Sequence, residues 1–163
     1  MNKHYKIIFT SIFLFILIGS PALFAHCEIP CGIYNDKLRI DLLKEHTDTI
    51  EKSMKQIAEL SAAGEENYNQ LIRWVVNKEE HANQFQHIVT QYFMTQRIKM
   101  PEDSSVKEAY LNKLSLLHEL LVLAMKSKQT TDIENCNKMR QVIDTFSNAY
   151  FGKEELQHLK EHK

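Results

Sequence analysis

Four stretches of the chain carry apolar residues at intervals of three, four and seven positions, and this spacing restricts the fold more than any other feature. Such intervals mark the buried face of an amphipathic helix. Glycine and proline are scarce, since only Gly64, Pro101 and Gly152 follow Gly32. The four sets are Leu43, Ile50, Met54, Ile57 and Leu60; Ile72, Val75, Val76, Phe85, Val89, Tyr92 and Phe93; Val106, Tyr110, Leu114, Leu117, Leu121 and Ala124; and Ile133, Cys136, Met139, Ile143, Phe146 and Tyr150.

Short polar breaks separate these stretches at residues 61–66, 99–104 and 127–131. Ser105 and Thr131 stand where helix N-caps are expected, and Pro101 interrupts the second break. Four amphipathic helices with short connections predict an all-α fold, an antiparallel up-and-down four-helix bundle. The charged residues 152–163 are expected to form a short helix or a frayed tail.

The first 25 residues have the pattern of a cleaved secretory signal peptide. Lys3 and Lys6 precede an apolar run over residues 7–18, and Ala25 supplies the small residue at the cut. The run is too short for a membrane-spanning helix, which needs about 20 apolar residues. We therefore expect an exported protein, periplasmic or extracellular, that a signal peptidase or maturation protease has cut after Ala25.

Cleavage there leaves 138 residues, enough for one domain with its own core. The domains expected are the signal peptide at 1–25, a metal-binding hook at 26–34 and the bundle with its charged tail at 35–163. Losing Lys3 and Lys6 lowers the net charge from −1 to −3, and no basic patch stands out. Nucleic acid is therefore not an expected partner.

Several nitrogen and sulfur atoms that could bind a metal lie close together at the start of the mature chain. A histidine at a free N-terminus offers the α-amine and the imidazole, and Cys27 adds its amide nitrogen and thiolate. Cys31 adds a second thiolate, so five donors lie within six residues. Mixed nitrogen and sulfur donors favour nickel or copper. A disulfide between Cys27 and Cys31 is the structural alternative in an exported protein.

Other residues that suggest chemistry have simpler explanations. Cys136 lies on the fourth apolar stripe and is expected to be a small buried side chain. Bundles that bind two irons carry Glu-x-x-His on two helices. This chain has one such match, Glu155 with His158 in the tail, which argues against a di-iron oxidase.

The residues His26, Cys27, Pro30, Cys31, Gly32 and Tyr34 form the pattern His-Cys-x-x-Pro-Cys-Gly-x-Tyr. This pattern closely resembles the nickel hook of the nickel superoxide dismutase family, and the predicted bundle extends the resemblance over the mature chain. The resemblance implies a superoxide dismutase that converts superoxide to dioxygen and hydrogen peroxide by one-electron cycling of nickel. It also implies one nickel ion per subunit and a homo-oligomer, a hexamer of four-helix bundles.

The resemblance also assigns roles within the hook. The His26 amine, the Cys27 amide and the sulfurs of Cys27 and Cys31 are expected to form a plane around nickel, with the His26 imidazole as the axial ligand of the oxidised state. A cis bond before Pro30 would turn both sulfurs toward one metal. Tyr34 would order water and restrict entry to small anions.

Residues around the hook follow the family less closely. Glu28 stands where aspartate is frequent, and Tyr92 resembles a second tyrosine near the pocket, although a core role is equally compatible with its position. The family's acidic partner of the axial imidazole corresponds to Asp41 if one residue is missing after Tyr34. The family's arginine corresponds to His81, so this chain would place a pH-sensitive group there.

Two functions other than dismutation remain compatible with the sequence. An exported bundle with an N-terminal His-Cys pair also suits a nickel or copper carrier. A disulfide-linked helical interaction protein without metal is the third possibility.

Overall fold

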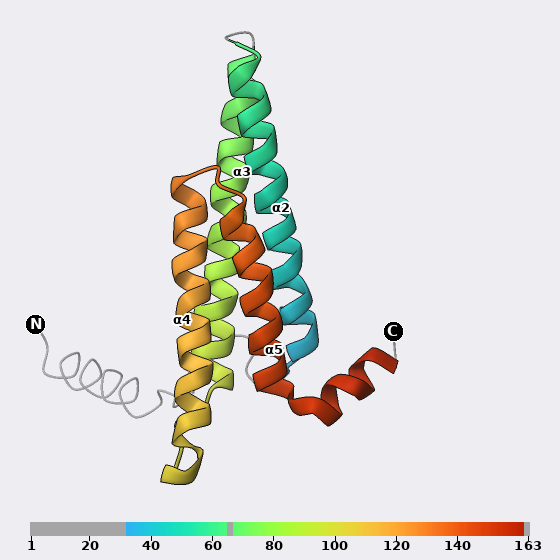
Figure 1. Cartoon of the computed structure of the whole chain (residues 1–163), viewed down its shortest axis with the longest axis vertical. Helices are drawn as coiled ribbons and strands as arrows, with labels where there is room; N and C mark the ends of the chain where they lie inside the picture. Colours follow the sequence, from blue (N-terminus) through green and yellow to red (C-terminus); the bar gives the residue numbers. More distant parts are fainter. Residues whose placement is uncertain (1–31, 65–66, 162–163) are drawn as a thin grey trace, which may run out of the picture. The chain divides into compact units, whose positions relative to one another are not determined.

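A computed structural model describes residues 32–64 and 67–161, and the described part is almost wholly helical. The elements are α2 (Asp36–Ala62), α3 (Tyr68–His87), the π-helix η2 (Ile88–Arg97), the 3₁₀ turn η3 (Ser104–Val106), α4 (Lys107–Gln129) and α5 (Glu134–Glu161). Helices α2 and α3 pack together, as do α4 and α5, and α2 also contacts α5 while α3 contacts α4 (Figure 1). This arrangement confirms the all-α four-helix bundle. No described helix has the length and hydropathy needed to cross a membrane.

Asparagine and aspartate side chains cap the starts of α2, η3 and α5, whereas the starts of α3 and α4 have no side-chain cap. The Asn35 side chain accepts a hydrogen bond from the Leu38 amide at 3.0 Å. Asp103 accepts from the Ser105 amide at 2.8 Å, and Asp132 accepts from the Glu134 amide at 3.0 Å. The prediction of Ser105 and Thr131 as caps was therefore wrong, because in both turns a nearby aspartate carboxylate accepts the hydrogen bond from the free backbone amide.

The core lies between the four helices and is built from the predicted stripes. Phe93, Phe146 and Tyr150 form edge-to-face and tilted ring contacts with centroids 5.1 to 5.5 Å apart. Cys136 is fully buried with its sulfur 3.8 Å from that of Met54, and burial raises the pKa of its thiol to about 11. The prediction of Cys136 as a small buried side chain is confirmed.

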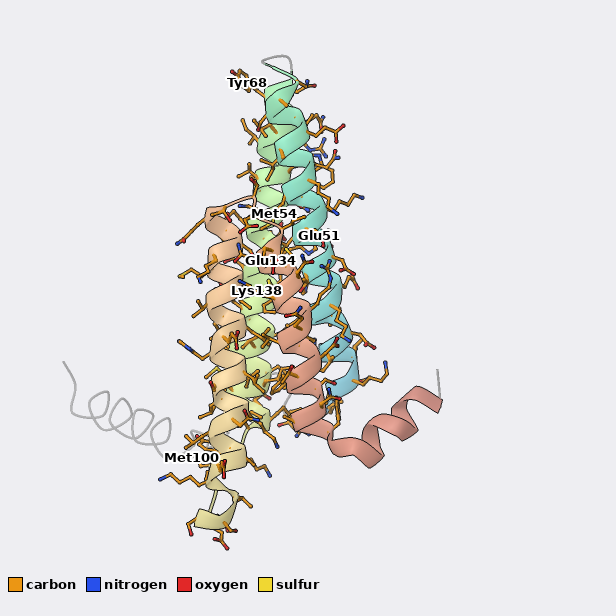
Figure 2. All side chains as sticks on the ribbon, viewed as in Figure 1. Glu51, Met54, Tyr68, Met100, Glu134 and Lys138 are labelled. Atoms are coloured by element: carbon orange, nitrogen blue, oxygen red, sulfur yellow. The ribbon has the colours of Figure 1, made fainter. Side chains whose placement is uncertain are left out.

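The first half of α3 departs from the prediction. Ile72, Val75 and Val76 were expected in the core, but their exposed fractions are 62%, 38% and 56%. The α2–α3 hairpin extends past the ends of α4 and α5, so none of the described helices covers this face (Figure 1). Figure 2 shows Tyr68 at the tip of that hairpin and Met100 at the opposite end of the bundle. Val106 and Ile133 are likewise exposed, because each precedes the helix that it was assigned to.

Lys78 joins α3 to the end of α4 through a buried ammonium group. Its Nζ donates to the carbonyl oxygens of Lys128 at 2.5 Å and Thr130 at 3.2 Å, and its side chain is 6% exposed. The last carbonyls of a helix have no partner within the helix. Lys78 therefore satisfies the C-terminus of α4 from a neighbouring helix.

We expect Lys78→Met to lower the free energy of unfolding by about 1–3 kcal/mol, because the two partly buried hydrogen bonds to the carbonyls of Lys128 and Thr130 are lost. Lys126→Met is the matched control on α4, since Lys126 is exposed, and its effect should stay within about 0.5 kcal/mol. Urea unfolding of both variants measures the difference. Equal stability of the two variants would show that Lys78 does not cap α4.

Candidate metal centre

The described part of the predicted metal-binding segment consists of Gly32, Ile33 and Tyr34. Gly32 has a φ of 79°, a left-handed conformation that glycine adopts without strain. Tyr34 is 40% exposed. His26, Cys27, Glu28, Pro30 and Cys31 lie outside the described residues.

Asp41 lies on an exposed face of α2. Its carboxylate accepts a hydrogen bond from Lys37 Nζ at 2.6 Å, one helical turn earlier. The side chain is 51% exposed, so this ion pair adds little to stability. An exposed carboxylate with one flexible partner remains available to another donor.

His81 lies on α3 beside His46 of α2. The two Nδ1 atoms are 2.9 Å apart, and the ring centroids are 5.1 Å apart. One Nδ1 must carry a proton and donate a hydrogen bond, and the other Nδ1 must accept that bond, because neutral imidazole has one donor and one acceptor nitrogen. This contact occupies Nδ1 of His81 and leaves its Nε2 for another partner.

The histidine pair lines a cleft of about 660 Å³ between α2 and α3, with Arg39, Glu45 and His87 among its other walls. Arg39 lies over the Tyr92 ring, with Cζ 5.0 Å from the centroid, and its buried Nε has no hydrogen-bond partner in the described structure. The sequence did not single out His46. The available signal was its position three residues after Leu43, on the apolar stripe of α2.

The histidine pair should make stability depend on pH. Burial lowers the pKa of His46 below its ordinary value of 6.5, and the charge on His81 lowers it further, against an opposing effect of Glu45. Below about pH 6.5 His46 binds a proton more readily in the unfolded chain than in the folded chain. The free energy of unfolding therefore has its full value above about pH 6.5 and decreases as the pH falls below it.

We expect the melting temperature of the wild type to fall more between pH 7 and pH 5 than that of His46→Gln, because the variant lacks the titrating group. His118→Gln, at an exposed position on α4, is the control and should follow the wild type. Calorimetry across this pH range measures all three. A His46→Gln profile parallel to the wild type would contradict the assignment.

Tyr92 belongs to both the core and a polar cluster. It is 4% exposed, and its hydroxyl donates to Oδ1 of Asp36 at 2.6 Å. Arg97 and Tyr150 bind the same carboxylate. The sequence missed Asp36, Arg97 and Tyr150 as a group, because they lie on three separate elements and fit no single periodic pattern.

The donors in the sequence fit a nickel ion. Among the described residues no group of three or more His, Cys, Asp or Glu side chains could hold a metal. The thiols of Cys27 and Cys31, the imidazole of His26 and the amine released by cleavage are the soft and borderline donors that suit late first-row metals.

A family model described as nickel-containing superoxide dismutase matches residues 22–154, which is most of the chain. The protein belongs to the nickel superoxide dismutase family. The match confirms the resemblance to this family, and it makes the chain a nickel-dependent oxidoreductase with superoxide as its substrate. Comparison with curated proteins and with solved structures gave no match.

Proposed function

We propose that the mature protein dismutes superoxide with one nickel ion per subunit, held by His26, Cys27 and Cys31 at an N-terminus that cleavage after Ala25 creates. The observation that carries this proposal is the complete hook pattern, directly behind a signal-peptide pattern and within the family match over residues 22–154. The α-amine of His26 is a donor only after the chain has been cut.

Nickel supplies one-electron cycling between its divalent and trivalent states. The thiolates of Cys27 and Cys31 and a deprotonated Cys27 amide would hold the ion and would bring three negative charges to it, which would favour the trivalent state. Reference pKa values are near 8 for an α-amine and about 8.5 for a thiol, so both groups release protons to a competing metal at neutral pH. The His26 imidazole supplies a further nitrogen for the oxidised state.

Tyr34 and the residues around the hook have supporting roles in this proposal. Tyr34 orders water and limits entry to small anions. Asp41 and His81 hold the His26 imidazole across a subunit contact. The exposed carboxylate of Asp41 supports this role, as does Nε2 of His81, which the contact with His46 leaves without a partner among the described residues. Tyr92 supports the same pocket through its bond to Asp36.

We expect His81→Ala to lower turnover by about 10- to 100-fold while nickel stays bound, because losing an outer partner of a metal ligand has this typical effect. His118→Ala, on an exposed face of α4, is the matched control and should keep wild-type turnover. Steady-state kinetics with metal analysis measures both. Wild-type kinetics in His81→Ala would show that His81 has no role at the metal.

Export and assembly complete the proposal. The leader directs the chain out of the cytoplasm, and the mature subunits form a homo-oligomer, a hexamer as in the family. The exposed apolar side chains of Ile72, Val75 and Val76 on α3 support self-association, since association would remove them from water. Sedimentation equilibrium of the mature protein gives the subunit number.

The direct test uses residues 26–163 with a free His26 amine, loaded separately with nickel, copper or zinc. We expect catalytic loss of superoxide in stopped-flow absorption with nickel alone. A protein that binds nickel stoichiometrically without turnover would be a carrier, and a Cys27–Cys31 disulfide without metal would indicate an interaction protein. Either result would contradict the proposed function.

A further inference from the structure

The carboxylate of Asp36 collects four hydrogen bonds from three side chains. Arg97 binds it bidentately, with Nε 2.8 Å from Oδ1 and Nη2 2.6 Å from Oδ2. The hydroxyl of Tyr92 donates to Oδ1 at 2.6 Å, and that of Tyr150 donates to Oδ2 at 2.8 Å. The Asp36 side chain is only 15% exposed, so both oxygens are satisfied mainly by protein donors.

Asp36 is also the residue at which the bundle begins. It is the first residue of α2, directly after the N-cap Asn35 and two residues after Tyr34. The N-cap fixes the backbone of the first turn, and the Asp36 carboxylate ties that turn to η2 and to α5. The chain that continues from this point toward the N-terminus carries the hook residues.

The π-helix η2 brings two of the donors to one side. Tyr92 and Arg97 are five residues apart, and in an α-helix they would point about 140° away from each other. A π-helix pairs residues five apart, so i and i+5 lie one above the other. Thr95 and Gln96 also donate side-chain hydrogen bonds, both at 2.9 Å, to carbonyls five residues earlier. Such helices are rare and occur often at functional sites.

The cluster keeps its charges at neutral pH. Burial alone would raise the pKa of Asp36, but the hydrogen bonds from Arg97, Tyr92 and Tyr150 bring it below its ordinary value of 3.8. Burial and the neighbouring Asp36 raise the pKa of Tyr92 to about 12, so this hydroxyl stays a donor. The four hydrogen bonds are therefore lost only in acid, as pH falls through the lowered pKa of Asp36.

We propose that Asp36 is a positioning residue for the metal centre: with Tyr92, Arg97 and Tyr150 it forms a clamp that fixes the first turn of α2, and with it the point from which the chain leads to the proposed nickel ligands. This inference rests on the proposed function. A fixed starting point removes part of the ordering cost that metal binding would otherwise incur, and it selects one arrangement of the donors.

Asp36→Asn and Asp48→Asn are the matched pair that tests the clamp. Both positions lie on α2 and both carboxylates pair with an arginine, Asp48 with Arg140 Nη2 at 2.8 Å, but Asp48 lies about three helical turns after Asp36. We expect Asp36→Asn to weaken nickel binding by about tenfold or more and to broaden the electron paramagnetic resonance spectrum of the oxidised metal. Asp48→Asn should leave both properties within about twofold of the wild type.

Tyr150→Phe extends the test if Asp36→Asn does not fold. This change removes one of the four hydrogen bonds and keeps the ring in its aromatic contacts. We expect a smaller loss of nickel affinity, together with faster amide hydrogen exchange at residues 38–40 in the metal-free protein. Tyr110→Phe on α4 is the control and should change neither property.

The outcomes separate the clamp from the proposed function. If the wild type binds nickel at its N-terminus but Asp36→Asn and Tyr150→Phe bind it with wild-type affinity and spectrum, the clamp is overturned and the function stands. If the wild type binds no nickel, the proposed function fails and the clamp's effect on the hook fails with it. Weaker binding and a broadened spectrum confined to the clamp variants support the inference.

Discussion

A chain that retains residues 1–25, or that carries one extra residue before His26, is expected to bind nickel poorly and to have no dismutase activity. The extra peptide bond converts the His26 amine into an amide, which removes one donor and its affinity for metal. The bundle does not depend on this amine, because its stability comes from the packed apolar faces of its helices.

The control for this experiment is an extended chain with a protease site directly before His26. Cutting that chain should restore nickel binding and activity in the same sample, while circular dichroism stays helical throughout. Nickel content by mass spectrometry and superoxide decay by stopped-flow absorption provide the two measurements. Full activity with the extension intact would contradict the assignment of the amine.

Cys27→Ser and Cys31→Ser are each expected to abolish activity without unfolding the bundle. A serine hydroxyl is a harder and far less acidic donor than a thiol, so neither variant can stabilise trivalent nickel. The nickel–thiolate absorption should disappear, and circular dichroism should remain helical. Loss of helix in both variants would instead make these cysteines structural.

Cys136→Ala is the matched control for the two hook cysteines. Its thiol is buried against Met54 and is kept protonated by burial, so its removal should leave metal binding and turnover unchanged. A small cavity should lower the free energy of unfolding by about 1 kcal/mol. Wild-type turnover in either hook variant would contradict the role of the hook thiolates.

The bundle followed from the sequence because helical periodicity is a local signal. The stripes around Leu43, Phe85, Leu117 and Ile143 all lie in the core. Ile72 and Val75 on α3 were predicted in the core but are exposed, because the relative lengths of neighbouring helices decide which part of an apolar stripe is covered. The π-helix was equally unpredictable from local periodicity, and two of its residues, Tyr92 and Arg97, contact a residue 56 or more positions away.

The candidate site likewise has one part that the sequence predicts and another part that only the structure shows. The donors of the hook lie within six residues, so their pattern is visible in the sequence alone. The partners of His81 and Asp36 depend on tertiary packing: His46 is 35 residues from His81, and Tyr150 is 114 residues from Asp36. No spacing rule relates residues so far apart, and the structure was needed to bring them together.

Electron paramagnetic resonance of the oxidised mature protein tests most directly whether nickel is held by the N-terminal histidine. We expect an unpaired electron on trivalent nickel with hyperfine splitting from one imidazole nitrogen, which changes when histidine is labelled with ¹⁵N. In His26→Ala the splitting should vanish and turnover should fall by orders of magnitude, while divalent nickel remains bound through the amine, amide and thiolates. An unchanged spectrum and unchanged turnover in His26→Ala would contradict the assignment of the imidazole.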